Sequence, residues 1–256
     1  IWSATLRSYC HPARMNLILL HPDELDAESR CVLTDGRAHH IRAVLKATAG
    51  KTLRVGLLDG PLGTGLTEQV DRHAVVMKCT FEDEAPPKPR IDLLLAMPRP
   101  KVMKRLWAQL SALGVGRIVL LRADKVERCY FDSHVLDPEF YEKWLFEGLQ
   151  QAKCTHLPEV LIRPRFKPFV EDELNTLFSK HLKLLADPSG EKRLADFFQS
   201  DHRSGRVVLA IGPEGGWTPY ELNQLEDHGF QLFGVGPRIL RTDTATVAML
   251  SMLAAY

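Results

Sequence analysis

The segment at residues 84–90 constrains this chain most, because it separates two different sequence patterns. It reads EAPPKPR, with three prolines within four positions. Proline fixes φ and lacks a backbone N–H, so such a run disfavours helices and central strands and favours an extended linker. We therefore expect one domain over residues 15–85 and a second over residues 86–256.

The first domain has the pattern of a small β structure. Short β-rich pieces at residues 16–20, 53–57 and 74–81 are separated by glycine-rich turns, which include residues 59–61 and 63–65. One helical segment, at residues 39–46, lies among them. Short strands at close spacing predict a small barrel.

The second domain alternates strands and helices. A run of apolar residues at 91–96, interrupted only by Asp92, is followed by apolar residues at helical spacing between Val102 and Leu113. Further strands are expected at residues 117–122, 182–186, 207–211 and 231–235. Alternation of this kind predicts a parallel sheet covered by helices, an α/β fold.

Composition excludes several classes of protein. The chain has 256 residues with 45% hydrophobic and 25% charged side chains, as in an ordinary globular protein. No apolar run approaches the roughly 18 residues of a membrane span, so we expect no membrane association. The five cysteines are scattered without a CxxC pair, which argues against a disulfide framework or structural zinc, and we expect no metal.

Residues 1–14 contain Arg, Ser and Thr but no acidic residue, and we expect the fold to begin at Met15. We interpret residues 1–14 as an extension, either a tag remnant or the tail of an organelle transit peptide. The expected location is the cytoplasm, with a mitochondrion or plastid as the alternative if residues 1–14 are a transit-peptide remnant.

The formal net charge of +1 hides an uneven distribution. Residues 84–170 contain 15 basic and 10 acidic side chains, whereas residues 171–256 contain 8 basic and 12 acidic ones. The basic excess fits either a solvated helix face or a surface for a phosphate backbone, and the sequence alone leaves both readings open.

Three strand ends in the last third of the chain are expected to form one crevice. The strand at residues 207–211 runs into GPEGGWTPYE, in which Thr218, Pro219 and Glu221 predict a capped helix start. The strand ending at residue 235 runs into GPRILRTDTA, before an apolar helix at about 244–255 that Thr242 or Asp243 would cap. The strand at 182–186 ends in DPSG. Ligands of open α/β sheets bind at such carboxyl ends, although a tight turn is the alternative for the glycine-dense loop.

These motifs resemble a known family. The segments HHIRAVLKATAGKTLRV, LLLAMPRPKVMKRLWAQLSALGVGRIVLL, AIGPEGGWTPYEL and VGPRILRTDTA resemble the RsmE-type 16S ribosomal RNA uridine-N3 methyltransferases of the SPOUT superfamily. The resemblance implies an N-terminal PUA-like RNA-binding β-barrel followed by a SPOUT α/β domain with a C-terminal trefoil knot. It further implies a homodimer that uses S-adenosyl-L-methionine (SAM) on small-subunit ribosomal RNA.

The resemblance also assigns site residues. The cofactor would lie against three loops that comprise Leu185, Ala186, Asp187, Ile211, Gly212, Pro213, Glu214, Gly215, Val235, Gly236, Pro237, Ile239, Leu240 and Thr244. Arg241 and then Arg238 would stabilise a uracil anion, and Glu214 would orient a ligand or act as a base. RNA phosphates would contact Arg42, Lys46, Arg99, Lys101 and Lys104.

Two other functions remain as alternatives. One is a SPOUT methyltransferase that acts on another RNA site, either a ribose 2′-O or a tRNA. The other is a non-catalytic ribosome-assembly factor that binds RNA and keeps a cofactor-like pocket.

Overall fold

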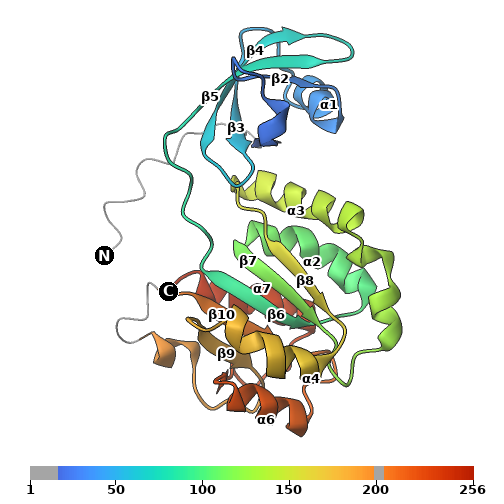
Figure 1. Ribbon diagram of the computed structural model, residues 1–256, viewed down its shortest axis with the longest axis vertical. Helices are drawn as coiled ribbons and strands as arrows, with labels where there is room; N and C mark the ends of the chain where they lie inside the picture. Colours follow the sequence, from blue (N-terminus) through green and yellow to red (C-terminus); the bar gives the residue numbers. More distant parts are fainter. Residues whose placement is uncertain (1–16, 199–204) are drawn as a thin grey trace. The chain divides into compact units, whose positions relative to one another are not determined.

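The computed structural model describes residues 17–198 and 205–256, which divide into two compact units between Ala85 and Pro86 (Figure 1). The extension expected at residues 1–14 lies outside the described residues. Each unit has a hydrophobic core of its own. Within the described ranges, no helix is long and apolar enough to cross a membrane.

Over residues 17–85, the first unit is a curled, mixed five-stranded sheet with one α-helix (Figure 1). Its strand order is β1-β3-β4-β5-β2, with β1 parallel to β3 and the other pairs antiparallel. Alternate side chains of β5 are buried, as expected for a sheet with one covered face. The elements are β1 (Ile18–Leu20), η1 (Pro22–Glu24), β2 (Arg30–Leu33), α1 (Gly36–Ala43), β3 (Thr52–Leu57), β4 (Leu62–Val70) and β5 (Val75–Phe81).

The turn predicted at residues 63–65 is wrong, because these residues lie inside β4. The glycines there serve close packing between strands. A Cβ atom on Gly63 would lie 2.3 Å from the carbonyl oxygen of Thr80 in β5, and one on Gly65 would lie 2.9 Å from Val55 Cγ1. Glycine inside a strand often marks such a close approach, which looks like a turn signal in the sequence.

The helix predicted at residues 39–46 begins and ends earlier, at Gly36–Ala43. Asp35 caps it by accepting a hydrogen bond from the backbone N–H of Arg37 at 2.9 Å. Lys46 lies beyond the helix end with a φ of 46°, so it does not share a helix with Arg42.

The second unit is built on a six-stranded sheet in which every pair is parallel. The strand order is β11-β9-β10-β6-β7-β8. Strands β7 and β8 therefore lie on one side of β6, whereas β9, β10 and β11 lie on its other side, so the strand order reverses between β6 and β10. All six residues of β6 are buried, as in a sheet covered on both faces. The strands are β6 (Ile91–Ala96), β7 (Val115–Leu121), β8 (Glu159–Arg163), β9 (Leu182–Ala186), β10 (Val207–Ile211) and β11 (Gln231–Phe233).

The predicted α/β pattern is confirmed, with shifts at the ends of some elements. Helix α2 packs against both α3 and α7, and α7 contacts β10. The expected cap of α7 is wrong: Arg241 is the N-cap, and both Thr242 and Asp243 lie inside the helix. The helices are α2 (Pro100–Ala112), η2 (Arg128–Asp132), η3 (His134–Leu136), α3 (Pro138–Ala152), α4 (Phe166–Pro168), η4 (Phe169–Glu173), α5 (Leu174–Leu177), η5 (Leu194–Phe197), α6 (Pro219–Asp227) and α7 (Thr242–Leu253).

A buried ionic cluster lies near the amino-terminal edge of this sheet. Asp92 of β6 is fully buried, and its carboxylate contacts His181 Nε2 at 2.8 Å and accepts from Arg206 Nη2 at 2.8 Å. Burial alone would raise the pKa of Asp92, but the hydrogen bonds from His181 and Arg206 hold it below its ordinary value. The cluster joins β6 to the residues that precede β9 and β10.

Candidate functional site

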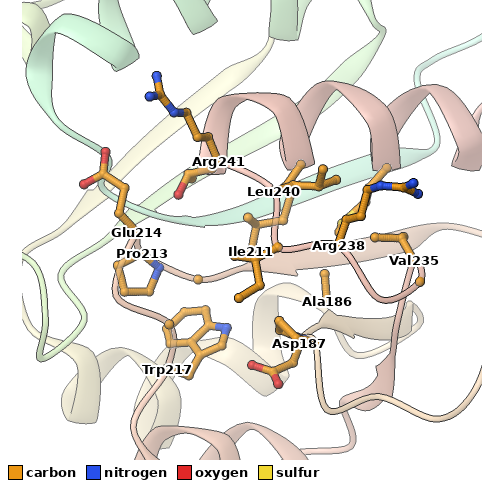
Figure 2. A pocket seen from close by; sticks show the side chains of 18 residues that line it. Ala186, Asp187, Ile211, Pro213, Glu214, Trp217, Val235, Arg238, Leu240 and Arg241 are labelled. Atoms are coloured by element: carbon orange, nitrogen blue, oxygen red, sulfur yellow. The ribbon is translucent and has the colours of Figure 1, made fainter.

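A cavity of about 290 Å³ lies at the carboxyl ends of β9, β10 and β11 (Figure 2). The loops that follow these three strands form its walls, and Ala245 and Met249 of α7 complete it. The prediction that the three strand ends form one crevice is therefore confirmed. The location beside the point where the strand order reverses is the usual one for ligands of open parallel sheets.

Most residues assigned to a cofactor line this cavity. Those that do are Ala186, Asp187, Ile211, Gly212, Pro213, Glu214, Val235, Gly236, Ile239 and Leu240. Four assigned residues, Leu185, Gly215, Pro237 and Thr244, are not among the lining residues of the described chain. Leu185 is fully buried within β9, and Thr244 is an exposed residue of α7. The lining residues that sequence reasoning missed include Trp217, Thr242, Ala245 and Met249.

Trp217 forms one wall of the cavity (Figure 2). It is 5% exposed, and its buried indole Nε1 has no hydrogen-bond partner within residues 17–198 and 205–256. A Cβ atom at position 212 would lie 2.9 Å from this nitrogen, so Gly212 leaves the space that the ring needs. Trp217 lies directly before the helix cap at Thr218, but this position alone does not indicate that its ring lines a cavity.

The capping box predicted at the start of α6 is confirmed. The Thr218 hydroxyl accepts from the backbone N–H of Glu221 at 3.3 Å, and the Glu221 carboxylate accepts from the backbone N–H of Thr218 at 2.9 Å. The same carboxylate also accepts from the backbone N–H of Asp124 at 2.7 Å, which fixes the loop after β7 against α6.

The charged residues predicted for catalysis lie at two ends of the cavity. Figure 2 shows Arg241 and Glu214 at one end and Arg238 beside Val235 at the other. Glu214 forms an ion pair with Arg99 at 3.6 Å, with side chains 39% and 70% exposed. The two arginines therefore do not converge, and Arg241 shares its end of the cavity with the carboxylate.

Helix α2 carries the other predicted basic residues of this unit. Lys101 and Lys104 are exposed, and Lys104 Nζ lies 5.8 Å from the ring centroids of Phe140 and Trp144. Arg105 Nη2 donates to Asp243 Oδ2 at 2.9 Å and so connects α2 to α7. Burial would raise the pKa of Asp243, but the Thr244 amide and Arg105 keep it below its ordinary value.

The two basic residues predicted in the first unit differ in their surroundings. The Arg42 guanidinium donates to the backbone carbonyls of Asp71, at 2.9 Å, and Arg72, so it holds the turn between β4 and β5. Lys46 is exposed. In the part of the chain that the structure describes, no group of three or more His, Cys, Asp or Glu side chains could hold a metal ion.

Two of the cavity loops touch at Gly190, and we expect Gly190→Ala to destabilise the protein by about 1–3 kcal/mol, as for an overpacked core. An added Cβ would lie 2.4 Å from the carbonyl carbon of Phe233 and 2.7 Å from the backbone nitrogen of Gly234. Backbone atoms cannot move aside as a flexible side chain can. Urea unfolding followed by tryptophan fluorescence measures the change.

Gly215→Ala is the matched control, because its Cβ would meet only the Lys125 side chain, whose Cδ lies 3.0 Å away. This variant should unfold at nearly the wild-type urea concentration. Equal unfolding free energies for the two alanine variants would contradict the close approach of the loops at Gly190.

Known proteins are similar to this chain over most of its length. An RNA methyltransferase domain family matches residues 85–254. The chain is 32% identical over 249 residues to ribosomal RNA small subunit methyltransferase E of Treponema pallidum, and the aligned region covers 94% of this chain and 91% of the relative. It is 27% identical to ribosomal RNA small subunit methyltransferase E 1 of Borreliella burgdorferi, with 91% of this chain and 95% of the relative covered.

Solved structures share the fold. One is ribosomal RNA small subunit methyltransferase E from Neisseria gonorrhoeae bound to SAM, with a TM-score of 0.75, 23% identity and coverage of 94% of this chain and 97% of that chain. Another, from Legionella pneumophila and described as a methyltransferase in complex with SAM, has a TM-score of 0.76 at 24% identity and covers 95% of this chain and 98% of that one. From the domain match and the full-length relatives, the chain belongs to the ribosomal RNA small subunit methyltransferase E (RsmE) family of RNA methyltransferases.

Proposed function

We propose that this protein is a SAM-dependent methyltransferase that methylates N3 of one uridine in small-subunit (16S-type) ribosomal RNA. The observation that carries the proposal is the cavity formed by three strand-end loops, in a chain whose full-length relatives are named as methyltransferases of this RNA. The preference for a uridine N3 rests on the GPRILRTDTA motif, whose Arg241 lies at the Glu214 end of the cavity.

The residues of the cavity suit SAM. The side chains of Ile211, Leu240 and Met249 give apolar surface for an adenine ring, and Asp187 provides a carboxylate for the polar part of the ligand. The buried Trp217 Nε1 is a donor with no partner among the described residues, as expected beside a polar ligand. The four assigned residues outside the lining are proposed to act only by supporting the loops.

The cofactor supplies a methyl group that is already activated as a sulfonium, so the protein needs chiefly to align the acceptor and stabilise charge. The N3 proton of uracil ionises well above neutral pH, so removal of this proton leaves a negative charge that must be stabilised. Arg241 is proposed to donate hydrogen bonds to the uracil oxygens, because a guanidinium stays charged and can donate twice.

Glu214 has two possible roles beside Arg241: it accepts the N3 proton, or it orients the base. Its ion pair with Arg99, at 3.6 Å, favours the orienting role in the resting protein, since this partner holds the carboxylate in place. Arg238, at the far end of the cavity, is proposed to contact the cofactor side rather than the uracil.

Finer features of fold and assembly belong to the same proposal. The curled sheet with α1 supports a PUA-like RNA-binding barrel over residues 15–85. The close approach of the loops at Gly190 and Gly234 supports a C-terminal trefoil knot. Exposed apolar side chains on the cavity loop and α7, Ile239 at 87% and Met252 at 42%, support a homodimer that covers them.

Calorimetry with SAM, followed by methyl transfer to unmodified small-subunit RNA, tests the function. We expect SAM binding, transfer and one new N3-methyluridine when the RNA is mapped by mass spectrometry. Modification of a ribose or a tRNA would favour the other SPOUT activity, and binding of RNA without transfer would favour an assembly factor. Absence of both SAM binding and methyl transfer would contradict the proposal that the protein is a methyltransferase.

A further inference from the structure

A second cavity, of about 480 Å³, lies at the carboxyl ends of β7 and β8 beside the start of α6. The loop after β10 separates it from the first cavity, because Trp217 lines the first and Thr218 lines the second. The rings of Trp217 and Phe166 lie 6.3 Å apart across this boundary. No residue of the second cavity has a role in the proposed methyl transfer.

Two aromatic side chains line this second cavity. Tyr220, the second residue of α6, is 52% exposed, and its ring centroid lies 6.4 Å from that of Phe166 at an interplanar angle of 58°. The Tyr220 ring is thus fixed at its base by α6 and open to a ligand. Exposed rings of this kind provide stacking surfaces for bases in single-stranded RNA.

Three cations share the cavity: Arg122, Arg165 and Lys167. Lys167 has a partner in Glu171 at 3.6 Å. Within residues 17–198 and 205–256, no side-chain ion pair or hydrogen bond engages Arg122 or Arg165, so both guanidinium groups can take an external anion.

Two carboxylates line the cavity as well, but they do not cancel this charge. Glu221 is 2% exposed, and its oxygens already accept from the backbone N–H groups of Thr218 and Asp124. Asp124 is exposed. The accessible charge of the cavity is therefore positive, next to an open aromatic ring.

We propose that this second cavity binds a nucleotide that flanks the methylated base in the same RNA strand. Arg122 and Arg165 hold its phosphate, and its base stacks on Tyr220. The inference rests on the proposed RNA substrate. A planar ring beside unpaired guanidinium groups matches the two parts of a nucleotide, whereas a free phosphate would leave the ring unused.

The test measures the affinity of the full-length protein for in vitro transcribed, unmodified small-subunit RNA at several salt concentrations. Arg165→Ala and Arg122→Ala should each reduce the slope of log K against log salt by about 0.7–0.9, because one phosphate contact is lost. Tyr220→Ala should weaken binding about tenfold with an unchanged slope, since stacking does not release counterions. Tyr220→Phe keeps the ring and should bind like the wild type.

Lys180→Ala is the matched control. Lys180 is exposed in the same unit but precedes β9, at the opposite edge of the parallel sheet from both cavities. This variant should keep both the affinity and the salt slope. SAM affinity, measured by calorimetry, should be unchanged in all five variants, because none of these side chains lines the first cavity.

The outcomes separate this inference from the proposed function. If the wild type binds and methylates the RNA while the Arg122, Arg165 and Tyr220 variants match Lys180→Ala, the second cavity does not hold RNA and only this inference is wrong. If the wild type binds no RNA, both proposals are wrong. A loss of affinity in Tyr220→Phe equal to that in Tyr220→Ala would also overturn the stacking contact.

Discussion

Replacement of Arg241 by alanine is expected to lower the turnover of methyl transfer by about 10²–10³-fold, the typical cost of losing one charge-stabilising donor. SAM affinity should stay near the wild-type value. The Arg241 side chain is exposed at the Glu214 end of the cavity, where we place the uracil. The backbone role of this residue survives the change, because α7 uses only its carbonyl oxygen, which accepts from the Ala245 N–H at 2.8 Å.

Single-turnover methylation at saturating SAM, together with calorimetry of SAM binding, measures the two effects separately. Arg238→Ala is the matched control, because the same side chain is removed at the other end of the same cavity. It should lose SAM affinity more than turnover. If Arg241→Ala loses SAM binding and turnover to the same extent, Arg241 binds the cofactor and does not stabilise the uracil anion.

The sequence predicts the parallel sheet well because burial on both faces leaves largely apolar runs, interrupted only by Asp92 in β6 and Lys183 in β9. Strands β6, β9 and β10 were expected at the residues where they occur. Strand β8 was missed. Its charged ends, Glu159 and Arg163, belong to the strand at the sheet edge and are paired with Arg117 and Glu173, so they do not mark it as a core strand.

The candidate site is predicted in part for a similar reason. Glycine and proline at strand ends have a local signature, which is why the three loops could be located from the sequence. Trp217 and Met249 enter the cavity only through tertiary packing, and their local sequence gives no sign of it. Likewise, the separation of Arg238 from Arg241 depends on the path of the loop and not on their spacing of three residues.

The buried carboxylate of Asp92 is expected to have the largest effect on stability. Asp92→Ala should lower the free energy of unfolding by about 3–5 kcal/mol, because removal of one partner of a buried ionic cluster leaves the others uncompensated. His181 is 7% exposed at its side chain and loses its partner, whereas Arg206, at 42%, can recover part of its hydration. We therefore expect a value near the lower end of this range.

Urea unfolding followed by tryptophan fluorescence measures the loss in the second unit, since Trp107, Trp144 and Trp217 all lie there. Glu159→Ala is the control: it breaks the ion pair with Arg117, but Glu159 is 52% exposed, so the loss should stay below about 1 kcal/mol. Similar losses in the two variants would contradict a structural role for the Asp92 cluster.

The pH dependence provides an independent test of the same carboxylate. Because the folded protein holds the pKa of Asp92 below its ordinary value, the stabilisation is present above the unfolded pKa of about 4 and is lost as pH falls through the lower folded pKa. The difference in unfolding free energy between the wild type and Asp92→Asn should thus be constant from about pH 7 to 5 and shrink below about pH 4. A difference that stays constant down to acid unfolding would mean that the charge of Asp92 contributes nothing and that the loss in Asp92→Ala comes from the removed volume alone.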